Sequence, residues 1–325
     1  MKTPIMKPRK TNSRHKPSFR KTMKKLSNSE KKHIVHILNP VTPQTAFEEF
    51  VKLKNMMKCA TAHRTSSRTT LGNNVVDAFT LGERLHTEGH QGISFYDFWI
   101  NRKDYLRKPY IKKMLDFYKN RKIEELRKYK YIYNLYFSSI SIFRPIVAID
   151  VYCQVKAKRV LDFTMGWGGR LVGACALSLE AYYGVELNKH LEKPYKEMVD
   201  MLKTVPGHKT DINLNFDDAL QIDYSKMDYD TVLTSPPYYD LEKYRLSTVY
   251  KSHEDWNEHF YKPLFQMTYK HLKKGGNYCL NVPGNIYEDC CVPVLGICAK
   301  KIPMKKGERN IGGDYKEYIY IWDKK

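Results

Sequence analysis

Apolar and polar positions follow two different patterns in the two halves of the chain. In the second half, short runs rich in β-branched and aromatic residues predict strands at 158–163, 181–185, 212–216, 230–233 and 278–282. Longer stretches with apolar residues three and four positions apart predict helices at 170–179, 190–204 and 253–272. An alternating stretch predicts a last strand at 315–322. Strands that alternate with helices are typical of an α/β fold with a mainly parallel sheet.

The first half has mainly helical spacing, as at Tyr110, Met114, Phe117 and Tyr118. Before it, residues 1–35 hold almost no apolar side chains and are expected to form a disordered basic tail. We therefore divide the chain into a tail at 1–35, a helical region at 36–149 and an α/β domain at 150–325. The polar stretch at 64–91 receives no assignment.

Charge changes this picture because it is concentrated in two segments. The net charge is +21, and residues 1–35 hold twelve Lys and Arg against one acid. Residues 101–131 hold another twelve against four acids, whereas the chain after residue 150 is nearly neutral. Clustered positive charge favours a nucleic-acid partner, bound by the tail or by the helical region. The alternatives are a solubilising tail and a solvated helix face.

Several classes of protein are excluded. No run of about 18 apolar residues is present, so we expect no membrane span. The basic N-terminus lacks the apolar core of a secretory signal. Seven cysteines without a CxxC pair are typical of reduced thiols, which predicts an intracellular protein, cytoplasmic or nuclear. His86 and His90 have helical spacing, but Gly89 and Gly92 argue against a rigid helix, so no metal site is expected.

The first chemical motif is the run VLDFTMGWGGR at 160–170, a strand followed by a glycine-rich turn and a helix. Glycines let a ligand approach the backbone closely, and the N-terminus of a helix favours a carboxylate. The candidate ligand-binding residues in this motif are Asp162, Thr164, Gly166, Gly168 and Gly169.

Acids at the ends of the next two strands extend this site. Glu186 ends the second strand, where a carboxylate can accept both hydroxyls of a ribose. Asp217 and Asp218 follow the third strand, where an acid can accept an adenine amino group. The GxGG turn lacks the GxGxxG pattern that holds a pyrophosphate. A nucleoside with a carboxylate and no phosphate, such as S-adenosylmethionine, therefore fits better than NAD. The alternative is that Asp162 and Glu186 are ordinary strand-end residues.

The second motif is LTSPPYYD at 233–240, after the fourth predicted strand. Two prolines make a rigid loop at the edge where α/β sheets bind ligands. Ser235 offers a hydroxyl, Pro236 a fixed carbonyl and Tyr238 an aromatic ring, with Pro237 completing the tetrapeptide. This set suits a planar base that carries an amino group. The alternative is a purely structural Pro-Pro turn.

Together, DFTMGWGG at 162–169 and TSPPY at 234–238 resemble the S-adenosylmethionine-dependent amino-methyltransferases of nucleic acids. Phe143 and Pro145 resemble the F-x-P element that this family carries on the cofactor side. The resemblance covers about 140–325. The basic, aromatic-rich composition is also similar to that of methyltransferases of large DNA viruses.

The resemblance implies a Rossmann-like, class I methyltransferase fold with a seven-stranded, mainly parallel sheet and an antiparallel last strand. It implies methyl transfer from S-adenosylmethionine to N6 of adenine or N4 of cytosine in DNA, with Ser235, Pro236, Pro237 and Tyr238 as catalytic residues. No long recognition segment follows Tyr238, so target recognition falls to residues 36–149 or to a partner. The alternatives are an RNA adenine methyltransferase and a nucleic-acid-binding protein with an inactive methyltransferase domain.

Overall fold

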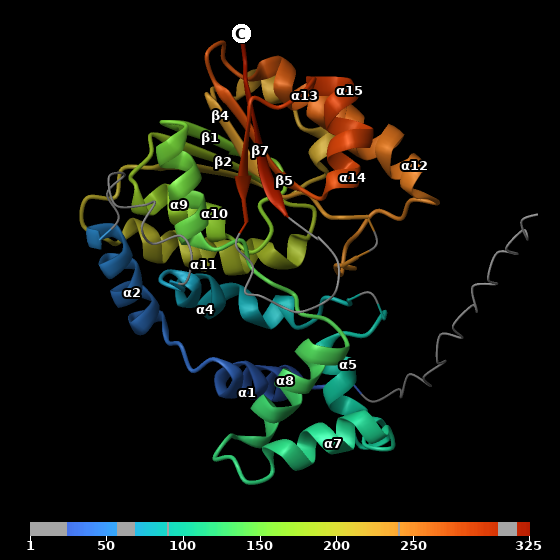
Figure 1. The fold of residues 1–325 in the computed structure, drawn as a ribbon. Helices are drawn as coiled ribbons and strands as arrows, with labels where there is room; N and C mark the ends of the chain where they lie inside the picture. Colours follow the sequence, from blue (N-terminus) through green and yellow to red (C-terminus); the bar gives the residue numbers. More distant parts are fainter. Residues whose placement is uncertain (1–24, 57–68, 90, 240, 305–316) are drawn as a thin grey trace, which may run out of the picture.

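The centre of the molecule is a seven-stranded sheet in the order β3-β2-β1-β4-β5-β7-β6 (Figure 1). The computed structural model describes residues 25–56, 69–89, 91–239, 241–304 and 317–325. The strands are β1 Arg159–Asp162, β2 Ala181–Val185, β3 Asp211–Asn215, β4 Thr231–Thr234, β5 Asn277–Val282, β6 Lys300–Pro303 and β7 Tyr318–Asp323. Strands β1 to β5 pair in parallel, and β7 is antiparallel to both β5 and β6. The predicted Rossmann-like fold class is confirmed.

Both faces of the sheet are buried. Successive residues of a strand point to opposite faces, so neighbours in sequence belong to different apolar clusters. Val160 belongs to one buried apolar cluster and its neighbour Leu161 to the other. Ile321 and Trp322 divide in the same way on β7. This is why the strands in the sequence are short apolar runs rather than alternating ones.

Helices form a layer on each face. One face packs against α9 Pro145–Gln154, α10 Gly169–Ala176 and α11 Glu192–Lys203, with α2 Pro43–Met56 and α4 Asn73–Arg84 in contact with them. The other face packs against α12 His253–Trp256, α13 Lys262–His271, α14 Gly284–Ile286 and α15 Val292–Leu295 (Figure 1). Two π-helical turns, Asn257–Tyr261 and Tyr287–Cys291, interrupt this second layer. Short 3-10 turns lie at Lys189–Leu191, Ala219–Gln221 and Tyr224–Lys226.

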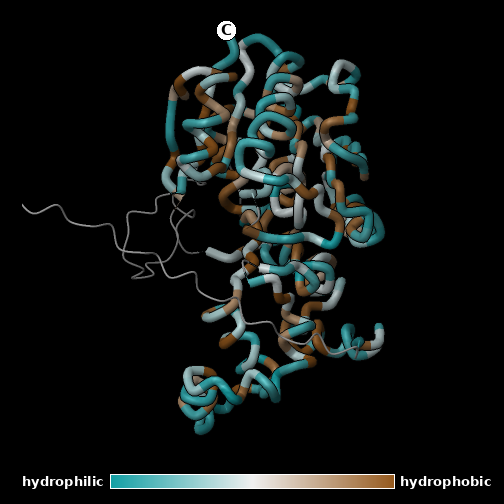
Figure 2. Tube along the Cα trace, turned by 90° about the vertical axis from the view of Figure 1, so that its right-hand side faces the viewer, coloured by the Kyte–Doolittle hydropathy of each residue, from teal (hydrophilic) through white to brown (hydrophobic). Residues whose placement is uncertain are grey.

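A separate group of helices lies at one end of the molecule, where hydrophilic residues predominate (Figure 2). It comprises α1 Asn28–Leu38, α5 Phe95–Ile100, α6 Arg102–Tyr105, α7 Pro109–Tyr118 and α8 Glu125–Tyr136. Its core is aromatic: the Phe98 ring lies 4.9 Å from that of Phe137, and the Tyr133 ring stacks on Phe137 at 5.9 Å. These helices therefore have a core of their own, as the predicted helical region requires.

The structure differs from the predicted organisation at two boundaries and in one strand. Helix α1 begins inside the predicted tail, because Ser27 and Glu30 form a reciprocal capping box; residues 1–24 lie outside the described part. Residue 150 falls within α9, which packs on α10 and belongs to the sheet layers. Strand β6 was not predicted, because Lys300 and Lys301 are exposed at the sheet edge.

The helices and the cysteines bear on two further expectations. No helix in the described ranges has the length and apolar character to cross a membrane. The thiols of Cys175, Cys279, Cys290, Cys291 and Cys298 are free, as expected. Cys153 is disulfide-bonded, which corrects the expectation of reduced thiols throughout. Spacing along the chain does not tell which thiols meet in space.

Candidate functional site

A cavity of about 430 Å³ lies at the carboxyl ends of β1, β2 and β4. Its wall includes six of the residues that the sequence singled out: Thr164, Gly166, Glu186, Asp218, Ser235 and Pro237. The glycine-rich turn and the SPPY loop are about 70 residues apart in sequence, yet both reach this cavity. The parallel order of β1, β2 and β4 brings them together, because parallel strands end at the same edge of a sheet.

The glycine-rich turn needs its glycines for backbone conformation. Gly166 and Gly168 have φ angles of 57° and 95°, in the left-handed region that favours glycine. The Tyr195 hydroxyl donates to the carbonyl oxygens of Met165 and Gly166, at 3.1 Å and 3.0 Å. Tyr195 therefore fixes the turn, and Gly166 lies in the cavity wall.

The F-x-P element packs behind this turn. A Cβ on Gly169 would lie 1.8 Å from the backbone oxygen of Phe143 and 3.6 Å from Cδ of Pro145. The guanidinium of Arg170 lies 5.0 Å from the centre of the Phe143 ring. Phe143 and Pro145 are not in the cavity wall, so they support the loop rather than face the cavity.

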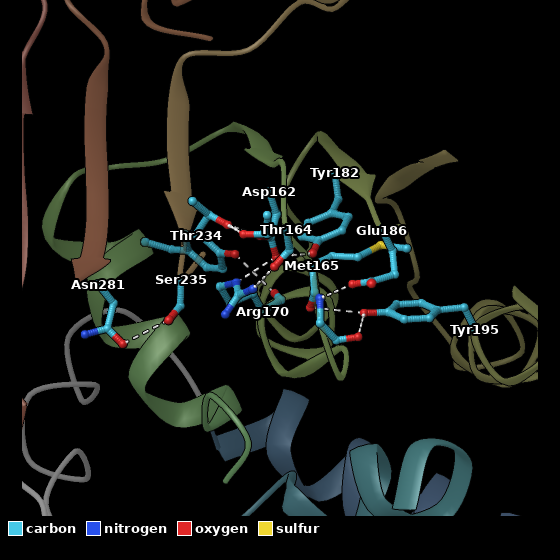
Figure 3. Close-up of polar contacts among 12 residues, drawn as sticks. Asp162, Thr164, Met165, Arg170, Tyr182, Glu186, Tyr195, Thr234, Ser235 and Asn281 are labelled. Carbon is cyan, nitrogen blue, oxygen red and sulfur yellow. Dashed lines mark hydrogen bonds and ion pairs between the residues drawn. The ribbon is translucent and has the colours of Figure 1, made fainter. Parts of the chain in front are cut away.

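Glu186 ends β2 and holds the glycine-rich turn. Its Oε2 accepts from the backbone N–H of Gly166 at 2.9 Å, and its Oε1 accepts from that of Asn188 at 2.9 Å (Figure 3). Burial raises the pKa of this carboxyl to about 7, although the two backbone donors favour the charged form. Glu186 is therefore an acid that titrates near neutral pH at the edge of the cavity.

Asp162 lies behind the cavity and not in its wall. Its Oδ2 accepts from Arg170 Nε at 2.7 Å and from the Tyr182 hydroxyl at 2.6 Å. Its Oδ1 accepts from the Thr234 hydroxyl at 2.7 Å, and this hydroxyl lies 2.6 Å from that of Thr164. Figure 3 shows these side chains pointing toward one another. Asp162 is fully buried and joins the end of β1 to the end of β4.

The SPPY loop places Ser235 in the wall of the cavity and directs Tyr238 toward β5. The Ser235 hydroxyl donates to Oδ1 of Asn281 at 3.3 Å (Figure 3) and lies 3.0 Å from the Tyr238 hydroxyl. The Tyr238 hydroxyl lies 3.1 Å from Oδ1 of Asn281 and 3.1 Å from Oε1 of Glu317. Pro236 is buried, while Pro237 reaches the wall. Ser235 and Tyr238 are thus fixed by one amide side chain.

The next residue, Tyr239, forms an aromatic wall. Its φ of 51° turns the chain, and its ring stacks on His253 at 3.8 Å. Its backbone N–H donates to the Tyr261 hydroxyl at 3.0 Å, and Trp256 lines the cavity beside it. Sequence reasoning did not find the contribution of His253 and Trp256, because the helix that carries them begins more than ten residues after the SPPY loop.

Residues 242–250 form much of the remaining wall, and the first half of the chain holds this segment. Arg245 Nη1 lies 3.1 Å from Oε2 of Glu83, whose Oε1 accepts from Asn188 at 3.1 Å. The backbones of Glu88 and Lys243 exchange hydrogen bonds of 2.9 Å and 2.8 Å. α4 and the residues after it therefore help to build the site.

Some predicted residues have other positions. Asp217 is exposed and accepts from the backbone N–H of Asp218, and only Asp218 of this pair lines the cavity. Gly168 packs against Met198. His86 lines the cavity, and burial lowers its pKa to about 4; His90 lies outside the described residues.

Sequence reasoning also missed Asn281. This side chain is 3 % exposed and donates from Nδ2 to the Tyr318 carbonyl at 3.1 Å. A polar residue near the end of the apolar strand β5 was the available signal.

No protein-family profile matches the chain, and no curated protein is similar to it in sequence. Among solved structures, TrmN from Thermus thermophilus aligns with 16 % identity and a TM-score of 0.39, over 56 % of this chain and 49 % of TrmN. An rRNA methylase from Streptococcus thermophilus aligns with 14 % identity and a TM-score of 0.35, over 57 % of this chain and all of that chain. The alignment thus spans about half the length of TrmN. Likenesses this distant carry no argument about activity.

Proposed function

We propose that this protein is an S-adenosylmethionine-dependent methyltransferase that acts on the exocyclic amino group of a base in nucleic acid. The observation that supports this most is the shared cavity: Ser235 and Pro237 lie in the same wall as Gly166 and Glu186. A site for a nucleoside and a loop suited to an aromatic amine therefore adjoin.

The residues present fit this cofactor. The cavity of about 430 Å³ is large enough for a nucleoside with an amino-acid tail, and aromatic side chains line part of it. Glu186 can accept from ribose hydroxyls, and Asp218 from an adenine amino group. The glycine-rich turn admits the amino-acid end near the start of α10. When bound, the cofactor supplies an electrophilic methyl group.

The chain's own contribution is to hold the amine. The Ser235 hydroxyl donates its hydrogen to Oδ1 of Asn281, so its lone pairs remain available to accept a hydrogen of the amino group. The Pro236 carbonyl accepts the second amino hydrogen, because the prolines fix its direction. Both bonds favour a more tetrahedral nitrogen and grow stronger in the transition state. Asn281 is a positioning residue for Ser235 in this scheme.

Tyr238 has the task of stacking on the base, which is worth about 1–3 kcal/mol. Tyr238 is not in the cavity wall, and its hydroxyl is tethered to Asn281 and Glu317 on the β5 side of the sheet, so stacking requires its ring to turn toward the cavity. A base within a duplex must first be flipped, at a cost of a few kcal/mol. A single-stranded target avoids that cost.

The resemblance in the two motifs favours DNA, with adenine N6 or cytosine N4 as the acceptor. RNA adenine is the second candidate, because the described residues after SPPY include no long recognition segment that would favour a DNA site. One experiment separates them: incubate the protein with labelled cofactor and single- or double-stranded DNA or RNA, digest the product, and identify the methylated nucleoside by mass spectrometry. A labelled N6-methyladenosine or its deoxy counterpart, or N4-methyldeoxycytidine, is the expected product.

Cofactor binding tests the inactive alternative. Calorimetry of the wild type, of Glu186→Ala and of the control Glu180→Ala is expected to give binding that only Glu186→Ala weakens. Glu180 lies beside the start of β2, exposed and paired with Arg159, so it is far from the cavity along the same strand. If the wild type binds no cofactor, the methyltransferase proposal is wrong.

A further inference from the structure

A second cavity, of about 230 Å³, lies among the helices at the end of the molecule. It is enclosed by α4, α8 and the end of α1, and none of its residues lines the proposed methyl-transfer site. The polar members of its wall are Asn39, Asp77, Arg84, Lys130 and Asn134. Polar side chains from three separate elements therefore converge on one space.

Arg84 is only partly paired. Its Nη2 bonds to Oδ1 of Asp77 at 2.5 Å, and the other carboxylate oxygen accepts from Asn39 Nδ2 at 3.1 Å. Nη1 of Arg84 is buried and has no hydrogen-bond partner within the described ranges, and the side chain is 10 % exposed. A buried guanidinium nitrogen without an acceptor costs free energy that a bound acceptor would recover.

Lys130 also lacks an acceptor. Its ammonium lies 4.9 Å from the centre of the Phe95 ring and 4.8 Å from that of Tyr133, and the described residues give it no hydrogen bond or ion pair. Burial lowers its pKa to about 7, and the neighbouring Arg84 cation lowers it further, although Asp77 acts in the opposite direction. Two cations thus share Asp77 as the acid in the cavity wall.

We propose that this cavity binds a phosphate group through Lys130 and Arg84. A phosphate offers several acceptor oxygens, so it can accept from Nη1 of Arg84 and from the Lys130 ammonium at once. The negative charge of the phosphate balances the positive charge that remains after Asp77 has neutralised one of the two basic side chains. The amides of Asn39 and Asn134 supply further donors on the cavity wall.

The last turn of α4 lies near both cavities. Glu83 holds Arg245 and Asn188 beside the first cavity, and Arg84, the next residue, lines the second. The phosphate can come from free inorganic phosphate or from the backbone of a nucleic acid. Neither source requires methyl transfer, so the inference stands apart from the proposed function.

The test is a phosphate titration of the full-length protein by calorimetry. We expect the wild type to bind inorganic phosphate, Lys130→Met to bind about tenfold more weakly, and Lys128→Met to match the wild type. Lys128 lies on the same helix but not in the cavity wall, so it controls for net charge. Absence of binding by the wild type, or equal loss in both variants, would overturn the proposal.

Thermal melting gives a second readout. Phosphate is expected to raise the melting temperature of the wild type more than that of Lys130→Met, because the general stabilising effect of phosphate is common to both proteins, and equal increases would contradict the proposal. A short single-stranded oligonucleotide then separates the two sources. It displaces phosphate if a backbone phosphate is the natural ligand, and it leaves phosphate binding unchanged if the site takes free phosphate.

Discussion

If Glu186 accepts the ribose hydroxyls as proposed, its raised pKa makes cofactor affinity depend on pH. With a pKa of about 7, about a tenth of the molecules carry the carboxylate at pH 6 and about nine tenths at pH 8. Ribose hydroxyls donate to the carboxylate, so only the charged form accepts both of them. Affinity for the cofactor is therefore expected to rise about tenfold from pH 6 to pH 8, in proportion to the competent fraction.

Glu186→Gln removes the titration while keeping the size of the side chain. Calorimetry at pH 6, 7 and 8 on both proteins gives the ratio of their affinities, in which any titration of the cofactor itself cancels. The variant is expected to bind more weakly at pH 8, because an amide nitrogen cannot accept the backbone N–H of Gly166 or Asn188. A ratio that stays constant from pH 6 to pH 8 would refute the reasoning.

The raised pKa of Glu186 also makes the stability of the ligand-free protein depend on pH. The pKa of the Glu186 carboxyl is raised in the folded state, from 4.5 to about 7. As pH rises, this carboxyl therefore loses its proton in the unfolded chain at a lower pH than in the folded protein. The free energy of unfolding is therefore expected to fall as pH rises through this window, by at most about 3 kcal/mol. Urea titrations at pH 4.5 and pH 7.5 measure this loss. Glu186→Gln is expected to lack this part of the pH dependence.

Three substitutions test the rest of the site. Gly169→Ala is expected to destabilise the protein by several kcal/mol in urea titrations, because its Cβ would meet a backbone oxygen at 1.8 Å, whereas a Cβ on Gly284 would meet nothing within 4 Å. Arg170→Met is expected to cost about 3–5 kcal/mol, because it leaves the buried carboxylate of Asp162 without its cation; an unchanged urea midpoint would contradict this. Tyr238→Ala is expected to abolish methyl transfer in the labelled-cofactor assay while calorimetry still detects cofactor binding, and full activity would remove its proposed role.

The sheet could be predicted because its strands are encoded locally. β2 occupies the predicted residues, and β1, β3, β4, β5 and β7 overlap theirs. β6 could not be predicted, since two exposed lysines in a four-residue edge strand carry no apolar signal. The π-helical turn at Asn257–Tyr261 divides the predicted helix at 253–272 and puts the buried Trp256 and Tyr261 five positions apart. It was not predicted, because Phe260, four positions after Trp256, maintains the helical spacing in the sequence.

The candidate site was predictable only as far as its loops. Gly166, Glu186 and Ser235 reach the cavity because each follows a parallel strand, and strand order alone places them. The direction of a side chain is a tertiary property. Asp162 turns inward to a buried guanidinium, and the hydroxyl of Tyr238 turns to Asn281. Neither orientation follows from the spacing of the motifs.

The helical region and the α/β domain are joined through α4. In α4, Val75 and Val76 belong to the sheet-side core and Leu81 to the core of the helical end. Its last turn holds Arg245 over one cavity through Glu83 and places Arg84 in the other. Because α4 packs into both cores, a ligand in the helical end that shifts α4 is expected to shift the wall of the first cavity as well. Binding of the proposed phosphate ligand and binding of the proposed cofactor are therefore expected to be linked through this one helix.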